Sequence, residues 1–210
     1  MRKVTKIVVG VAAASLLAGA VTACSSSKDT KPVATIPSLT GNSTSVALDA
    51  GFLKDLTALK LTPGLVGTAT MPTAGTLTFP ITGGHVTVYK KGSVNPYVQG
   101  DIQHNGSGFT LTSGATKVTL ENFDINPGKN AVLYGDVLVN GASAAKHAPL
   151  FTLHGSTLKP ITIANGVATL TGTHVNVSPT AASLLDKTFN TTAVTGGLLV
   201  GVATILAKVS

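Results

Sequence analysis

Residues 98–125 read VQGDIQHNGSGFTLTSGATKVTLENFDI, and they show the pattern that dominates the chain. Short runs of Val, Ile, Leu, Phe and Thr are separated by Gly and Asn. Branched and aromatic side chains favour strands, whereas Gly and Asn favour turns. The stretch therefore predicts short strands rather than helices. Similar runs extend from GTLTFPI at 75–81 to VATLTGTHVNV at 167–177.

Three Asn-Gly pairs predict tight turns between these strands: Asn105-Gly106, Asn140-Gly141 and Asn165-Gly166. Both residue types accept the positive φ that type I′ hairpin turns require. Many short strands at this spacing indicate an antiparallel sandwich or barrel. Of the two, we expect a mainly β fold, an antiparallel β-sandwich of many short strands with two short α-helices.

The first helix is predicted after Asp49, a suitable N-cap, and is expected to end at Pro63-Gly64. Its apolar residues recur at helical spacing, namely Phe52, Leu53, Leu56 and Leu59. The second helix is predicted after Ser178, with Pro179 at its first position.

Residues 196–209, GGLLVGVATILAKV, are apolar at both alternating sets of positions. This pattern indicates a central strand buried on both faces. A membrane span is the alternative, but the run is too short for one and carries Lys208 near its end.

The N-terminus has the pattern of a secretory signal. A basic start with Arg2, Lys3 and Lys6 precedes an apolar run over residues 7–20. Val21-Thr22-Ala23-Cys24 then resembles the bacterial lipobox, in which the cysteine receives a diacylglycerol thioether and the chain is cut before it. The alternative is an ordinary signal peptide cut near Ala23, which leaves Cys24 as a free thiol.

The chain of 210 residues is accordingly divided into three parts. Residues 1–23 are expected to be a lipoprotein signal peptide, residues 24–45 a flexible Ser/Thr/Pro-rich tether, and residues 46–210 the folded domain. The tether prediction rests on a polar stretch without any period, which buries too little apolar surface to offset its ordering entropy. We expect an exported protein, anchored by lipid to the outer face of the cell membrane.

The formal net charge of +7 does not indicate a nucleic-acid partner. Three of the cations belong to the predicted signal, and its Arg2 is the only arginine in the chain. Recognition of phosphate and guanine relies on the bidentate arginine fork. The lysines are scattered and would favour an anionic envelope surface weakly.

No catalytic or metal-binding motif is present in the sequence. The five histidines form no pair of metal-ligand spacing, and G-x-S-x-G, P-loop and strand-linked G-x-G-x-x-G motifs are absent. The eight carboxylates are dispersed along the chain. We therefore expect neither an enzyme nor a metal site, and we name no catalytic residue.

Five segments in this order resemble the haem-transport-associated (HtaA-type) domain of secreted bacterial cell-envelope proteins. They are LTFPITGGHVT, residues 98–125 above, AVLYGDV, APLFTLHGSTL and HVNVSPTAASLL. The resemblance covers roughly residues 46–206 and implies a β-rich fold with two short helices.

In haem-binding members a tyrosine of the N-terminal helical segment ligates iron, and a histidine of the G-x-I-x-H stretch assists. His104 matches that histidine, which makes it the haem-binding candidate of this chain. The helical segment DAGFLKDLTALKL has no tyrosine, and Phe52 there offers no oxygen to iron.

The residues around His104 predict a second, structural role. It directly precedes Asn105-Gly106 and shares a strand face with Val98 and Ile102, so we interpret it as a hairpin histidine at the edge of an apolar face. Tyr97 is expected on the opposite face.

These observations favour a lipid-anchored, non-catalytic surface domain that binds a small ligand or an envelope component, with haem as the ligand that the resemblance names. The alternative is a structural or adhesive envelope protein with no small-molecule pocket. That alternative is favoured by an aromatic content of 4% and the absence of tryptophan, which leave little to stack on a porphyrin.

The lipobox makes a direct prediction. The substitution Cys24→Ala removes the thiol that would carry the lipid, so the protein should leave the membrane fraction or accumulate as an uncut precursor. Fractionation followed by mass determination checks this. Normal processing and membrane retention of the variant would contradict the lipobox interpretation.

Overall fold

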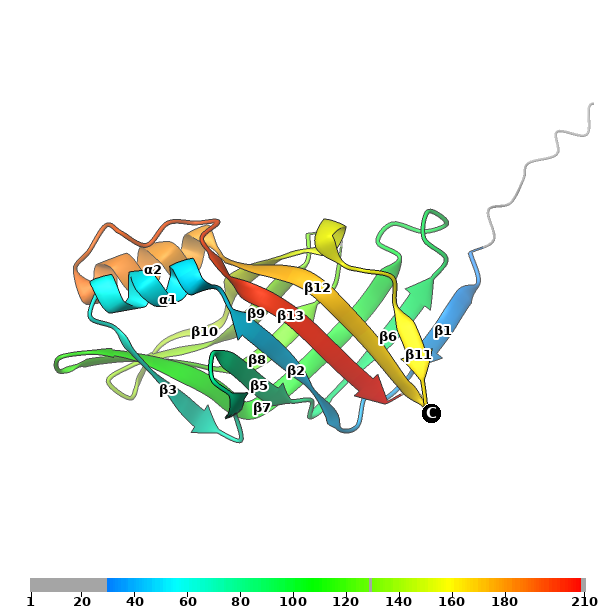
Figure 1. Cartoon of the computed structure of the whole chain (residues 1–210), viewed down its shortest axis with the longest axis horizontal. Coiled ribbons are helices and arrows are strands. Elements are labelled where there is room, and N and C mark those ends of the chain that lie inside the picture. Colours follow the sequence, from blue (N-terminus) through cyan, green and yellow to red (C-terminus); the bar gives the residue numbers. More distant parts are fainter. Residues whose placement is uncertain (1–29, 129, 209–210) are drawn as a thin grey trace, which may run out of the picture.

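The computed structural model describes residues 30–128 and 130–208, so the predicted signal peptide and Cys24 lie outside the described residues (Figure 1). The chain folds into the following elements: β1 (Pro32–Ile36), β2 (Asn42–Leu48), α1 (Ala50–Ala58), β3 (Thr62–Gly67), β4 (Thr70–Thr73), β5 (Thr76–Pro80), β6 (Gly83–Tyr89), β7 (Val98–Ser113), β8 (Thr116–Asn126), β9 (Val132–Val139), β10 (Ala142–His154), the 3₁₀ turn η1 (Gly155–Thr157), β11 (Thr162–Ala164), β12 (Val167–Val177), α2 (Pro179–Phe189) and β13 (Leu199–Lys208). The predicted mainly β class with two short α-helices is confirmed. No helix among the described residues has the length and apolar character needed to cross a membrane.

The strands form one hydrogen-bonded antiparallel sheet in the order β1-β6-β7-β8-β9-β10-β12-β13-β2-β5-β4, with β3 paired to β7 and β11 to β12. The sheet folds over on itself, so that β2, β12 and β13 form a layer in front of β6 to β9 (Figure 1). The four pairs from Phe151–Val177 to His154–His174 join the layers at one side through β10 and β12. Between the layers lies a single apolar core, in which Phe79 of β5 meets Phe123 of β8 edge-on at a centroid distance of 5.3 Å.

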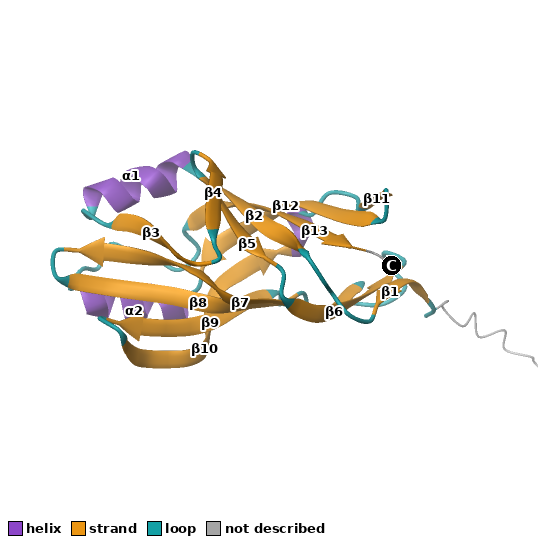
Figure 2. Ribbon diagram, turned by 90° about the horizontal axis from the view of Figure 1, so that it is seen from below, coloured by secondary structure: helices purple, strands orange, loops and turns teal. Residues whose placement is uncertain are grey.

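Both helices begin at the predicted caps and lie at the same end of the molecule (Figures 1 and 2). The Asp49 carboxylate accepts from the Gly51 amide at 2.8 Å, and the Ser178 hydroxyl accepts from the Ala181 amide at 2.9 Å. Helix α1 ends at Ala58, before the expected stop at Pro63-Gly64, and both of those residues belong to strand β3. The helix ends instead because the backbone at Lys60 is left-handed, with a φ of 55°, which a right-handed helix cannot continue through.

Two of the three predicted Asn-Gly turns are confirmed. Asn140-Gly141 joins β9 to β10 and Asn165-Gly166 joins β11 to β12, and all four residues have positive φ. Asn105-Gly106 makes no hairpin, because β7 continues through it. There the β7–β8 register shifts between His104 and Gly108, which is a bulge inside one long strand.

The bulge is held by side chains of the neighbouring strands. The Gly106 amide donates to Oδ1 of Asn122 on β8 at 2.9 Å, and the Asn122 amide donates to Asp136 on β9 at 3.1 Å. Asp136 in turn accepts from the His147 amide on β10 at 3.0 Å. Gly106 on β7, Asn122 on β8 and His147 on β10 have positive φ, and Asp136 on β9 joins the last two through its hydrogen bonds, so the irregularity crosses four strands.

The folded domain begins earlier than the sequence analysis placed it. Residues 32–36 form β1 and pair with β6, and residues 42–48 form β2 between β13 and β5. The boundary at residue 46 is thereby corrected to Pro32, because residues 32–36 and 42–45 of the expected flexible tether belong to strands. The sequence analysis did not predict strand β2 because most of its residues are Ser, Thr and Asn. Only alternate positions of it, Thr44 and Val46, are buried.

Strand β13 occupies the predicted central position, between β12 and β2. Only one of its faces is fully buried, through Val200, Ala203, Ile205 and Ala207. The other face is half-buried and ends at exposed Leu206, so the expectation of burial on both faces is corrected.

Candidate functional site

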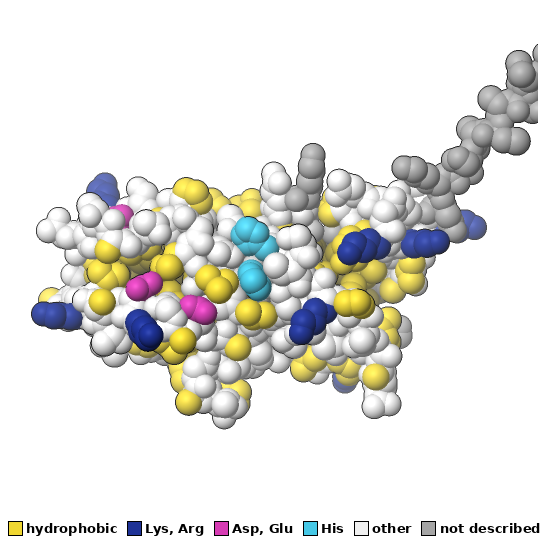
Figure 3. All heavy atoms as spheres, turned by 45° about the horizontal axis from the view of Figure 1, so that its top comes forward, with side chains coloured by type: hydrophobic (Ala, Val, Ile, Leu, Met, Phe, Trp, Pro, Cys, Tyr) yellow, Lys and Arg dark blue, Asp and Glu magenta, His cyan; other side chains and the backbone are white. Residues whose placement is uncertain are grey.

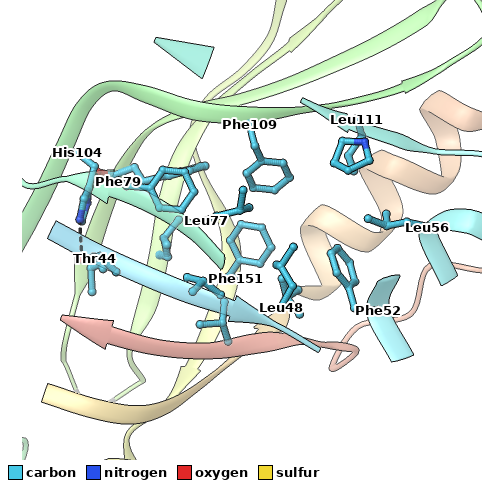
Figure 4. A pocket seen from close by; sticks show the side chains of 17 residues that line it. Thr44, Leu48, Phe52, Leu56, Leu77, Phe79, His104, Phe109, Leu111 and Phe151 are labelled. Atoms are coloured by element: carbon cyan, nitrogen blue, oxygen red, sulfur yellow. Dashed lines mark hydrogen bonds between the residues drawn. The ribbon is translucent and has the colours of Figure 1, made fainter. Parts of the chain in front are cut away.

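His104 lies in the core between the two layers, with a side chain that is 1% exposed. Its Nε2 is 2.8 Å from the hydroxyl of Thr44 on β2 (Figure 4). Its Nδ1 is 3.3 Å from the Phe123 carbonyl oxygen on β8. A carbonyl oxygen can only accept, so Nδ1 carries the proton and Nε2 accepts from the Thr44 hydroxyl. His104 thus links β7 in one layer to β2 in the other, and the interpretation as a hairpin-edge histidine is wrong because β7 continues past it.

Burial lowers the pKa of His104 to about 4, and the hydrogen bonds to the backbone of Phe123 and Ile102 offset only part of this effect. The imidazole is therefore neutral at physiological pH. A neutral ring with both nitrogens engaged has no free lone pair for a ligand.

The cavity next to His104 is small. It has a volume of about 40 Å³ and is lined mainly by aromatic and aliphatic side chains, including Phe79, Phe109 and Phe151. Phe52 of α1 lies at the opposite end of this cavity from His104 (Figure 4). Sites for small molecules usually measure roughly 300–1,000 Å³. The residues around His104 therefore do not fit a haem group while the two layers are closed.

The tyrosines do not gather around His104 either. No tyrosine is among the residues that line the core cavity. Tyr134 stacks on His147 with a centroid distance of 4.6 Å and an interplanar angle of 5°. Tyr97 packs against the core and lines a different cavity, described next.

A larger cavity opens at the end of the molecule opposite the helices. We call it the strand-end groove; its volume is about 420 Å³. One wall comes from β1, β6, β7, the end of β8 and the segment after it, and the other from β10 to β13 and the segments between them. Its large apolar side chains are Val33, Ile36, Val86, Val88, Tyr97, Val98, Ile102, Ile125, Leu153, Leu158, Ile161, Ile163, Leu170 and Ile205.

A further depression, between α2 and the β9–β10 turn, is wider but is lined largely by polar and charged side chains such as Asn140, Ser183 and Lys187. It lacks the apolar enclosure that small-molecule sites usually have. The strand-end groove is therefore the better candidate.

The remaining histidines form no metal centre in the described part of the chain, where no group of three metal-ligating side chains occurs. His85 contacts Asp101 at 2.5 Å, and His154 faces His174 across β10 and β12. The sequence analysis missed the second pair because its partners are brought together by strand pairing.

Comparison with solved structures identifies the fold. The C-terminal domain of HtaA from Corynebacterium glutamicum superposes with a TM-score of 0.55 at 15% identity, over 83% of this chain and 98% of that domain. The N-terminal domain of the same protein gives a TM-score of 0.53 at 13% identity, over 82% and 98%. No family model matches the chain, and neither does any curated protein. The resemblance to HtaA-type domains is thereby confirmed for the fold.

The burial of His104 predicts a specific loss of stability in acid. His104 has an ordinary pKa of 6.5 when unfolded and about 4 when folded. Between these values the unfolded chain binds a proton that the folded chain excludes, so stability falls as the pH drops from 6.5 to 4, by about 3 kcal/mol in all. Urea titrations of the wild type and of His104→Gln at several pH values between 6.5 and 4 measure how the free energy of unfolding of each protein depends on pH.

The variant should show a flatter profile, since glutamine does not titrate. Burial raises the pKa of Asp124, but that carboxyl is present in both proteins and cancels in the comparison. The same pH dependence in both proteins would contradict the burial of a neutral His104.

Proposed function

We propose that this chain is a non-catalytic binding domain, exported and lipid-anchored through Cys24 to the outer face of the cell membrane, and that it holds a small apolar ligand in the strand-end groove. One observation carries the proposal: a cavity of about 420 Å³ with mostly aliphatic walls. This volume falls within the range of roughly 300–1,000 Å³ that is common for small-molecule sites.

The chemistry of the groove supports binding rather than catalysis. Its polar side chains are the amide of Asn95, the hydroxyls of Tyr97, Ser156 and Thr173, and no carboxylate, imidazole or thiol lines it. These groups can orient a ligand by hydrogen bonds, but they offer no general base with a pKa near neutrality.

A haem-related role at His104 is the finer hypothesis that the HtaA resemblance suggests. For His104 to reach iron, it would have to leave Thr44 and the Phe123 carbonyl, and the layers around it would have to separate. Phe52 would still offer no oxygen to the metal. The groove needs no such rearrangement, and we therefore favour it over His104 as the ligand site.

The groove also argues against the alternative of a structural or adhesive protein without a pocket. Val33 is 69% exposed and Ile163 59% exposed, and both line the groove. Large apolar side chains exposed at the margin of an apolar cavity are typical of a surface that a ligand covers.

The proposal is tested with the neutral fluorescent probe N-phenyl-1-naphthylamine, which brightens in apolar sites. The protein is the chain from residue 24 onward with Cys24→Ser, so that no attached lipid competes. Ala34 of β1 lines the groove, and Ala34→Phe should reduce the probe signal by filling it.

The matched control is Ala47→Phe on β2, where the side chain is exposed and outside the groove. It should bind the probe like the unsubstituted protein, and thermal unfolding should show that both variants are folded. Absence of probe binding, or equal binding by Ala34→Phe, would contradict the groove as a ligand site.

A further inference from the structure

The chemistry of the strand-end groove and its borders points to one ligand class. We propose that the groove binds the hydrocarbon chain of a long-chain fatty acid and that lysines at its borders hold the carboxylate. This inference rests on the proposed function, since it names the ligand of the same groove.

The walls of the groove suit a flexible chain better than a ring system. Val, Ile and Leu account for nearly all its large side chains, and Tyr97 is its only aromatic residue. Planar ring systems such as porphyrins are usually bound by stacking on aromatic rings. An alkyl chain needs no stacking partner and gains its affinity from buried apolar area, about 25 cal/mol per Å².

The size of the groove also matches an alkyl chain. Its volume is about 420 Å³. Taking the volume of a water molecule, about 30 Å³, as that of a methylene group, this space holds roughly 14 such groups. A fatty acid of ordinary length would therefore fill the cavity and leave its head at the mouth.

Four exposed lysines lie in segments that border the groove. Lys90 and Lys91 follow β6, Lys159 lies between η1 and β11, and Lys208 ends β13; all four are exposed. The segments that contain these lysines, 86–98, 153–173 and 205–208, have no Asp or Glu. The acidic residues next to groove-lining positions are Asp101, which contacts His85, and Asp124. None of these four lysines forms an ion pair within the residues that the structure describes.

The surface view agrees with this distribution. On the face shown in Figure 3, acidic side chains occur only over the half that is remote from the described start of the chain, whereas the other half shows basic side chains alone. On this face, a carboxylate near the basic half of the molecule would meet mainly positive charge. Exposed ion pairs of this kind contribute modestly and weaken with salt.

The position of the groove relative to the proposed anchor gives it access to lipid. Val33 and Ala34 belong to β1, the first described strand, and line the groove. Seven residues lie between Cys24 and Pro32, so eight residue-to-residue steps separate the two. At most about 3.6 Å per residue, they place the start of β1 within roughly 29 Å of the lipid-bearing residue.

The test uses cis-parinaric acid, a fluorescent fatty acid, on the Cys24→Ser chain from residue 24. It is displaced by oleate and, separately, by oleyl alcohol, which has the same hydrocarbon chain without the charge. At low salt we expect oleate to bind at least about fivefold more tightly than the alcohol, as one or two exposed charge pairs would provide. Added salt should reduce the difference.

A quadruple variant tests whether the four bordering lysines hold the carboxylate. Replacing Lys90, Lys91, Lys159 and Lys208 by Gln should bring the affinity for oleate down to that for the alcohol. The matched control replaces four exposed lysines that do not border the groove, Lys54, Lys60, Lys117 and Lys187, and changes the net charge equally. It should keep the preference for oleate.

Each of the other possible results contradicts a defined part of the proposal. Equal affinities for oleate and alcohol, or equal losses in both quadruple variants, contradict the lysine-held carboxylate. Displacement by phosphatidylglycerol vesicles but not by oleate contradicts a free fatty acid. A protein that binds N-phenyl-1-naphthylamine in the groove but not parinaric acid retains the proposed function and refutes this inference, whereas failure of both probes refutes the two together.

Discussion

The hydrogen bonds of His104 join the two layers of the sheet, and much of the architecture follows from their burial. A polar group buried without a partner costs about 1–3 kcal/mol, so the closed fold must keep both ring nitrogens bonded. Thr44 on β2 and the Phe123 carbonyl on β8 do so, from opposite layers. The bulge that follows His104 keeps β7 continuous while its register changes, and the Ser107 hydroxyl, itself fully buried, donates back to the His104 carbonyl at 3.0 Å.

The fold matches that of HtaA domains, but the surroundings of His104 do not match the haem site expected from the sequence resemblance. The architecture is that of HtaA domains, yet the interior next to His104 is filled by phenylalanines and leaves a cavity of about 40 Å³. With Phe52 on α1 and a neutral, fully bonded imidazole, His104 serves the packing of the layers. The space large enough for a ligand lies at the other end of the sheet, where the strands at both ends of the chain meet.

Features set by neighbouring residues could be predicted from the sequence, and those set by distant pairing could not. Asp49 and Ser178 cap helices because their side chains bond amides two or three residues away, and Asn140-Gly141 turns because its own backbone favours it. Asn105-Gly106 has the same local preference, but its amide bonds Asn122 on the adjacent strand and the chain stays extended. Likewise, the polar residues around Thr44 predict a tether, but in the fold β5 and β13 pair on either side of its strand. The strand-end groove was missed for the same reason, since Val33, Val86 and Ile163 come together only in the closed sheet.

The most direct measurement of the central claim is nitrogen-15 NMR of the His104 ring, recorded with and without an equimolar amount of hemin. We predict a neutral ring protonated at Nδ1 from about pH 7 to about pH 5, since burial lowers its pKa to about 4, and signals that hemin leaves unchanged. Assignment of the signals follows from their loss in His104→Gln. Titration near the ordinary histidine pKa, or broadening of the His104 signals by hemin, would show that the ring is accessible and would contradict its role as a buried link between the layers.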